Sequence, residues 1–186
     1  MNPLPRIETP RTIIKLLDPD CAPLMTNYRV ENREHLTQWE PSRSGRFYTD
    51  EFWRIQLRSA IREYRHGLST CLVITNKDED EVIGVCNYTN IIRGTFEACH
   101  LGYGISQRHE GKGLMYEALA HSTEFVFKEV GLHRIMANYI PRNEKSGALL
   151  KRLGFEIEGQ AKRYLKINGV WEDHVLTSLL KPETPE

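Results

Sequence analysis

The sequence predicts an α/β (α+β) fold, with a mixed and mostly antiparallel sheet between helices. Short apolar runs typical of strands alternate along the chain with amphipathic helical segments. Three strand-like runs between residues 69 and 105 are separated by short polar turns, which favours antiparallel pairing. Near the C-terminus, Asn168-Gly169 separates two more such runs, and Asn-Gly is the favoured pair for a tight hairpin.

The first third of the chain is expected to hold one strand and three helices. Residues 11–17, rich in Ile and Leu, predict a strand. Asp18-Pro19-Asp20 can cap a helix that runs to about residue 30. A shorter helix over 31–38, a loop over 39–45 and a helix over 48–65 follow; Thr49 or Asp50 would cap the last of these.

The rest of the chain predicts a sheet interrupted by two helices. Strands are expected over 69–75, 81–92, 96–105 and 134–139. A helix that begins after Gly113 should run to about residue 129 with Gly131 as its C-cap, and a second covers 143–152. The final hairpin pairs 155–166 with 170–179, and residues 181–186 form a flexible tail. No repeat or low-complexity linker interrupts the chain, so we expect one domain over 1–186.

Composition excludes several classes of function. Twenty-five Lys and Arg residues balance twenty-five Asp and Glu residues, so nothing global indicates nucleic-acid or membrane binding. No apolar run approaches the ~20 residues of a membrane span, and residues 1–6 lack the apolar core of a signal peptide. The four cysteines form no Cys-x-x-Cys pair, and no zinc spacing appears, so we expect free thiols, a cytoplasmic location and no metal.

The most informative stretch is Arg108-His109-Glu110-Gly111-Lys112-Gly113, which lies between an apolar run and an amphipathic helix. Two glycines at a strand-to-helix corner let the backbone approach a ligand closely. The free amides of the first helical turn favour an anion such as phosphate, in which coenzyme A is rich. The chain contains no Walker loop and no Gly-x-Gly-x-x-Gly opening a βαβ unit, so those two phosphate-binding motifs are excluded.

This loop resembles the acetyl-CoA loop of the GNAT family of N-acetyltransferases. Downstream, the strand near residues 133–139, the helix start Asn143-x-x-Ser146 and the helix end Leu153-Gly154-Phe155 follow in the order that this family shows. Upstream, Glu31-Asn32-Arg33 and Trp39-Glu40-Pro41 resemble the N-terminal helices of the bacterial ribosomal-protein N-acetyltransferases, above all those that act on alanine. The resemblance covers nearly the whole chain. It implies the GNAT fold, in which the strands near residues 105 and 134 splay apart and admit the pantetheine arm of acetyl-CoA.

The expected cofactor is acetyl-CoA. The residues themselves predict that main-chain amides from 108 to 114 hold its diphosphate, with charge added by Arg108 and Lys112. The resemblance implies that pantetheine pairs with the main chain of Tyr103 and Ile105, and that Asn143 binds cofactor through its side-chain amide. The full expected set is Tyr103, Gly104, Ile105, Arg108, His109, Glu110, Gly111, Lys112, Gly113, Leu114, Asn143 and Ser146.

Acetyl transfer to an amine needs a base and an acid. Glu97 and His100 lie on the strand where many members of the family place the base, but their odd spacing points them to opposite faces, so at most one can face the acetyl group. The resemblance implies that Ser146 protonates the departing thiolate; the alternative is that Ser146 only supports Asn143 as a helix cap. Because a protein α-amine titrates near ~8 and a lysine near ~10.4, an α-amine acceptor requires only a modest base.

The acceptor is expected between the N-terminal helices and the last hairpin. Six residues could line its pocket, with core packing as the alternative for each aromatic one: Tyr28, Asn32, Trp39, Tyr88, Asn90 and Trp171.

The resemblance implies an enzyme that acetylates the N-terminal α-amine of a ribosomal protein that begins with alanine, similar to S5, either free or on the assembling ribosome. No membrane or nucleic-acid contact is expected. Two alternatives stay open: an acetyltransferase of the same fold for an aminoglycoside or polyamine, and a non-catalytic acyl-CoA-binding module in ribosome assembly.

Overall fold

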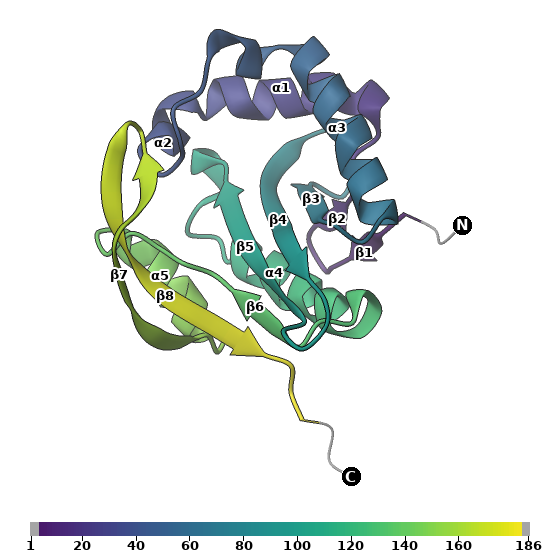
Figure 1. Cartoon of the computed structure of the whole chain (residues 1–186). Helices are drawn as coiled ribbons and strands as arrows, with labels where there is room; N and C mark the ends of the chain where they lie inside the picture. Colours follow the sequence, from purple (N-terminus) through teal and green to yellow (C-terminus); the bar gives the residue numbers. More distant parts are fainter. Residues whose placement is uncertain (1–3, 184–186) are drawn as a thin grey trace.

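The computed structural model of this chain describes residues 4–183 and is built on one eight-stranded sheet (Figure 1). The strand order is β1-β2-β3-β4-β5-β6-β8-β7. Neighbouring strands are antiparallel except β5 and β6, which are parallel. The sheet is therefore mixed and mostly antiparallel, as predicted. Its strands are β1 (Arg6–Glu8), β2 (Ile13–Lys15), β3 (Thr70–Thr75), β4 (Val82–Ile92), β5 (Ala98–Ile105), β6 (Arg134–Met136), β7 (Glu156–Ile167) and β8 (Val170–Leu180).

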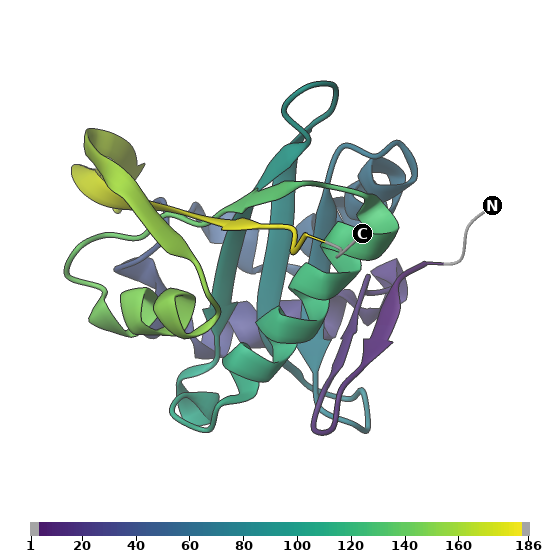
Figure 2. The same ribbon diagram turned by 90° about the horizontal axis from the view of Figure 1, so that it is seen from below.

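Helices cover both faces of the sheet, which confirms the predicted layers (Figures 1 and 2). One face carries α1 and α3, with the short α2 beside them, and the opposite face carries α4 and α5. The bounds are α1 (Ala22–Glu31), α2 (Arg33–Thr37), α3 (Asp50–Arg65), α4 (Leu114–Phe125) and α5 (Glu144–Arg152). A π-helical turn over Val126–Val130 extends α4, and 3₁₀ turns cover Pro19–Cys21, Gly45–Tyr48 and Gln107–His109.

Local sequence signals correctly predicted several helix ends and turns. Thr49 caps α3 by accepting a hydrogen bond from the amide of Phe52 at 3.3 Å. Gly131 ends the π-helical turn in the left-handed region, with φ of 72°. Asn168 and Gly169 both have positive φ, 44° and 84°, as a type I′ hairpin requires.

The predicted first strand was wrong in extent. Within residues 11–17 only Ile13–Lys15 forms a strand, β2, and the prediction missed its hairpin partner β1, which precedes a turn at residues 9–12. The predicted strand over 134–139 also ends early, at Met136, after which Tyr139 makes only an isolated bridge to Val175 of β8. The predicted tail begins one residue too early: the Lys181 amide still donates to the His133 carbonyl at 2.8 Å, and residues 184–186 lie outside the described part.

Two hydrophobic clusters fill the space on either side of the sheet. One joins β5 to α4 and α5 and includes Cys99, Leu101 and Leu119. The other joins β4 to α1 and α3 and includes Val85 and Leu57. The alternation of side chains along β4 and β5 therefore decides which residues face each helical layer. Among residues 4–183, no helix is both long and apolar enough to cross a membrane.

Candidate active site

A wedge opens between β5 and β6 because the two strands pair over only three residues (Figure 1). Ala98–His100 of β5 lies beside Arg134–Met136 of β6, and the register ends there. Beyond Met136 the chain follows β8: the Ala137 amide donates to the Thr177 carbonyl at 3.0 Å. The edge of β5 over residues 101–105 therefore faces the gap. The splay that the resemblance implied is present.

The main-chain groups on this edge can be assigned from one hydrogen bond. The Ser106 amide donates to the Ile83 carbonyl of β4 at 2.8 Å. In a strand, successive residues direct their main-chain polar groups to opposite edges. Those of Tyr103 and Ile105 therefore point into the wedge, where an extended chain with amide groups, such as pantetheine, could pair with them.

The glycine corner presents a run of free amides at one end of the wedge. Gly111 and Gly113 both have left-handed backbone, with φ of 70° and 74°, and Gly113 is the N-cap of α4. Within the described residues, the amides from 111 to 116 form no hydrogen bond with the chain. A Cβ built on Gly111 meets no atom within 4 Å, so the space beside this residue is open. Free amides, a helix N-terminus and open space are the features that favour binding of an anion.

Two of the amides predicted to hold diphosphate already have partners in the chain. Those of His109 and Glu110 donate to the carbonyls of Ser106 and Gln107 at 2.9 and 3.2 Å, which closes a 3₁₀ turn. Within the described residues, the run of amides without a partner extends from Gly111 past Leu114, the predicted limit, to Tyr116.

The charged side chains of the corner bind other protein groups. Arg108 donates to the Glu81 carboxylate at 2.7 Å. Glu110 pairs with Lys145 of α5 at 2.7 Å and with His35 of α2 at 3.1 Å. These contacts fix the corner to the elements around it. Lys112 is exposed, and no ion pair is found for it within residues 4–183.

Across the wedge, Ser146 and Tyr103 hold each other through their hydroxyl groups. Asn143 caps α5 by accepting a hydrogen bond from the Ser146 amide at 3.1 Å. The Ser146 hydroxyl takes no part in that cap. Its oxygen lies 2.7 Å from the phenolic oxygen of Tyr103. Burial raises the pKa of Tyr103 to about 12, so its phenol stays protonated at neutral pH. Both hydroxyl groups therefore stay protonated and can donate hydrogen bonds at this side of the wedge.

The opposite face of β5 is covered by helices at Gly104 and open at Gly102. His100, Gly102 and Gly104 share this face by alternation, and a Cβ on Gly104 would lie 3.5 Å from the Tyr28 hydroxyl of α1. A Cβ on Gly102 meets nothing within 4 Å. The register of β4 places Asn87 opposite Gly102. This glycine-lined floor beside the wedge leaves room for an acceptor chain.

His100 is the ionisable group on that floor. Its side chain is half-buried, and its Nδ1 atom is buried without a hydrogen-bond partner among the described residues. Burial lowers the pKa of the imidazole. The neutral ring can therefore accept a proton near pH 7.

Comparison with known proteins identifies the family. A model of the acetyltransferase (GNAT) domain matches residues 11–156 of this chain. The chain belongs to the GNAT acetyltransferase family. It is 43% identical over 181 residues to the [ribosomal protein uS5]-alanine N-acetyltransferase of Escherichia coli, and the match covers 97% of this chain and 93% of that protein.

Two solved structures of GNAT proteins are similar over almost the whole chain. The ribosomal-protein-S5-alanine acetyltransferase of Vibrio fischeri has a TM-score of 0.91 at 43% identity, covering 96% of this chain and 100% of that one. RimJ of Mycobacterium smegmatis, solved in complex with CoA-disulfide, has a TM-score of 0.87 at 28% identity, covering 98% and 89%. GNAT acetyltransferases bind acetyl-CoA, and the free amides, the open edge of β5 and the open space at Gly111 fit it here.

The two predicted bases of this GNAT enzyme lie in different surroundings. Glu97 precedes β5 with φ of 42° and an exposed side chain, outside the regular strand. Its carbonyl accepts the amides of His133 and Arg134 at 2.8 and 3.1 Å, which anchors the start of β6. Of the two, only His100 lies within β5 on the face of Gly102.

Three predicted acceptor residues are buried. Tyr88 is 0% exposed and its hydroxyl lies 2.7 Å from Ser122 of α4, so it belongs to the core on the other face. Tyr28 is also buried, with only its hydroxyl close to Gly104. Asn32 donates to the Tyr28 carbonyl at 2.8 Å and accepts the Gln107 amide at 2.9 Å. It supports the corner and lines no open surface.

The other three predicted acceptor residues have exposed surface. The Arg142 guanidinium carbon lies over the Trp39 ring, 5.0 Å from the centre of that ring. Trp171 on β8 is 58% exposed. Asn90 is exposed with φ of 52°, where the register of β4 with β5 shifts. On β4, the residues that share a face with His100 and Gly102 are Asn87 and Thr89, one position from those predicted. The period-2 pattern of the strand could have identified them.

Proposed function

We propose that this GNAT enzyme transfers the acetyl group of acetyl-CoA to the N-terminal α-amine of a ribosomal protein that begins with alanine. The observation that carries the proposal is the 43% identity over 97% of this chain to the uS5-alanine enzyme of Escherichia coli. Similarity of that degree includes the N-terminal helices and the last hairpin, which border the open floor. A ribosomal acceptor implies action in the cytoplasm, on free protein or on the assembling subunit.

The donor would bind along the wedge. The amides from Gly111 to Tyr116 would hold the diphosphate, and the main-chain groups of Tyr103 and Ile105 would hold the pantetheine arm. This arrangement directs the thioester end toward the paired part of β5 and β6, between Ser146 on one side and the floor on the other. Holding the two reactants together lowers the barrier by itself, because a bimolecular step becomes effectively unimolecular.

Two groups would assist the chemical step. As the amine nitrogen attacks the thioester carbon, the new C–N bond forms and the C–S bond breaks. His100 would take the proton from the amine, directly or through one water, because its imidazole is neutral at pH 7. Ser146, oriented by the Tyr103 hydroxyl 2.7 Å away, would donate a hydrogen bond to the departing sulfur, and solvent would supply the thiol proton and receive the proton taken up by His100.

The modest strength of this base suits an α-amine. Delivering a neutral α-amine of pKa ~8 at pH 7 costs about 1.4 kcal/mol, whereas a lysine of pKa ~10.4 costs over three times as much. A single half-buried imidazole is enough for the first task. The chemistry on the floor therefore supports a protein N-terminus as acceptor over an internal lysine.

The test is acetyl-CoA turnover against a panel of acceptors. The panel contains peptides with a free N-terminal Ala, Ser or Met, an Ala peptide with a blocked N-terminus and an internal lysine, and spermidine. We expect turnover with the free Ala peptide and no turnover with the blocked one. Turnover confined to the blocked peptide or to spermidine would overturn the proposal. Tight coenzyme A binding with no turnover of any acceptor would instead favour a non-catalytic module.

The same assay can separate the two forms of a ribosomal acceptor. Isolated uS5 bearing a free N-terminal alanine and small subunits that contain it are compared at equal concentration. Faster acetylation of the isolated protein places the reaction before assembly, and faster acetylation of the subunit places it on the ribosome.

A further inference from the structure

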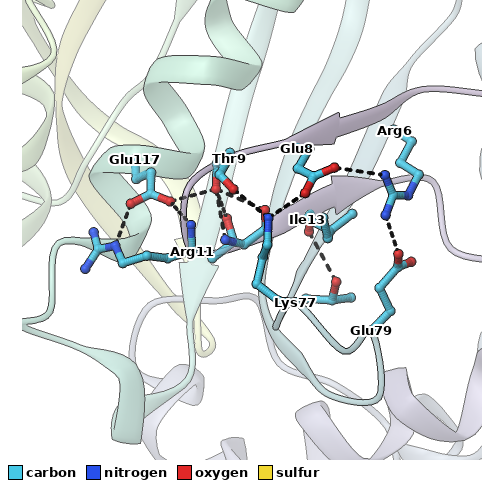
Figure 3. A network of polar contacts seen from close by, with 10 residues as sticks. Arg6, Glu8, Thr9, Arg11, Ile13, Lys77, Glu79 and Glu117 are labelled. Atoms are coloured by element: carbon cyan, nitrogen blue, oxygen red, sulfur yellow. Dashed lines mark hydrogen bonds and ion pairs between the residues drawn. The ribbon is translucent and has the colours of Figure 1, made fainter.

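The turn between β1 and β2 is hydrogen-bonded to the first turn of α4, although Arg11 and Glu117, which make the contact, are 106 residues apart in sequence (Figure 3). Glu117 of α4 accepts three hydrogen bonds from this turn. They come from the Thr9 hydroxyl at 2.6 Å, the Arg11 amide at 2.8 Å and the Arg11 Nε at 2.6 Å. The Glu117 side chain is only 12% exposed, so these bonds hold a largely buried carboxylate.

Arg11 also reaches the glycine corner itself. Its Nη1 donates to the carbonyl of Lys112 at 2.8 Å. Its Nη2 lies 3.6 Å from the position that a Cβ on Gly113 would occupy. One guanidinium therefore joins the middle residue of Gly111-Lys112-Gly113 to the helix that follows.

The turn between β1 and β2 is itself stabilised by hydrogen bonds. Thr9 and Thr12 are both buried, their hydroxyl oxygens are 2.8 Å apart, and the Thr9 amide donates to the Thr12 carbonyl at 3.0 Å. Hydrogen bonds also lower the pKa of Glu117: burial alone would raise it, but donation from Thr9 and Arg11 outweighs burial. The carboxylate therefore stays charged at neutral pH and remains paired with the Arg11 guanidinium.

We propose that Arg11 is a positioning residue for the diphosphate of coenzyme A. Gly111 and Gly113 give the corner its left-handed backbone, but glycine also leaves the backbone free to adopt many other conformations. An anion site made of amides is strong only when those amides already converge. The hydrogen bond from Arg11 to the Lys112 carbonyl supplies that order, and Glu117 fixes the guanidinium that makes the bond. The inference concerns donor binding and holds for any acceptor.

The experiment compares two donors in three variants. Acetyl-CoA carries the diphosphate, whereas S-acetylpantetheine lacks it and uses only the wedge. In Arg11→Gln, Arg11→Lys and Glu117→Gln we expect the KM for acetyl-CoA to rise about tenfold, with kcat at saturating donor within about twofold of wild type. Turnover of S-acetylpantetheine should not change. Glu8→Gln is the matched control, because Glu8 lies on the same hairpin and its carboxylate accepts from Lys77 at 2.7 Å, with no hydrogen bond to Arg11, Glu117 or the corner among the described residues.

Each outcome decides for or against the proposal. Arg11→Lys distinguishes the ordering of the glycine corner from the effect of charge. Lysine keeps the positive charge, but it cannot bond Glu117 and the Lys112 carbonyl at the same time as the guanidinium does. A wild-type KM in Arg11→Lys would assign the effect to charge and overturn positioning. Equal losses with both donors would show damage to the fold, and an unchanged KM in Glu117→Gln would refute the linkage. The double variant Arg11→Gln with Glu117→Gln should be no weaker than Arg11→Gln alone, because both break one unit.

Discussion

Removal of the Ser146 hydroxyl tests how much the proposed hydrogen bond to sulfur contributes. Its role would be to stabilise a departing thiolate, and for a thiol of pKa ~8.5 at pH 7 the limit of that stabilisation is full protonation, worth about 1.5 pKa units. This equals about 2 kcal/mol, or about thirtyfold in rate, as the largest benefit the group can give. The cap of α5 should survive in Ser146→Ala, because Asn143 accepts the Ser146 amide and not the hydroxyl. We therefore expect kcat to fall between about ten- and thirtyfold, with little change in stability.

The assay is release of free coenzyme A thiol with an N-terminal alanine peptide as acceptor. Tyr103→Phe removes the other half of the pair at 2.7 Å, so Ser146→Ala with Tyr103→Phe should be no slower than Ser146→Ala alone. Tyr164→Phe is the control: Tyr164 lies on the last hairpin, and its hydroxyl accepts only a long bond of 3.4 Å from Asn138 within the described residues. A kcat of Ser146→Ala within twofold of wild type would refute this hydrogen bond to the departing sulfur.

Four further predictions follow from single positions. Gly111→Asp places a carboxylate beside the free amides and should weaken coenzyme A binding at least ~tenfold more than the uncharged Gly111→Asn does; equal affinities by calorimetry would count against the corner. Gly102→Val fills the open floor, so the KM for peptide should rise while coenzyme A affinity stays constant; the reverse would move the acceptor elsewhere. Burial lowers the pKa of His100, so protonation of this imidazole should reduce kcat/KM below pH 6.5. In His100→Gln this acidic limb of the pH profile should disappear, while the limb due to the α-amine near pH ~8 should stay. In Gly147→Ala the new Cβ would lie 2.8 Å from the Tyr139 ring, and we expect about 1–2 kcal/mol of destabilisation by chemical unfolding, since overpacking exceeds the helix propensity gained; an unchanged midpoint would contradict this contact.

The parts of the structure that were predictable are those encoded by neighbouring residues. The glycine corner, the Asn168-Gly169 turn and the Thr49 cap each depend on a few adjacent positions with a special backbone or a capping oxygen. Sequence alone could find them because their chemistry is complete within four or five residues. The strand β1 gave no such signal: its three residues, Arg6–Glu8, alternate charged and apolar side chains too briefly to indicate a strand.

Errors arose where a side chain's face or partner depends on distant segments. Tyr88 was assigned to the acceptor because an aromatic group suits that role, but the register of β4 with β5 turns it into the core and puts Asn87 on the other face. Glu97 was assigned to β5, yet its positive φ and its bonds to the start of β6 remove it from the strand. Similarly, nothing near Ser146 in sequence indicates that Tyr103, 43 residues earlier, holds its hydroxyl.

The shape of the wedge is set by the C-terminal strand and not by the glycine corner. β6 pairs with β5 through Met136 only, whereas the same chain stays paired with β8 through Tyr139, whose amide donates to the Val175 carbonyl at 3.1 Å. Residues 137–139 therefore leave β5 while their main chain keeps its hydrogen bonds to β8, so the path of β8 directs the chain away from β5. The same strand continues into the last hairpin. A change in the register of β8 would therefore change the opening of the wedge, and with it the proposed donor site.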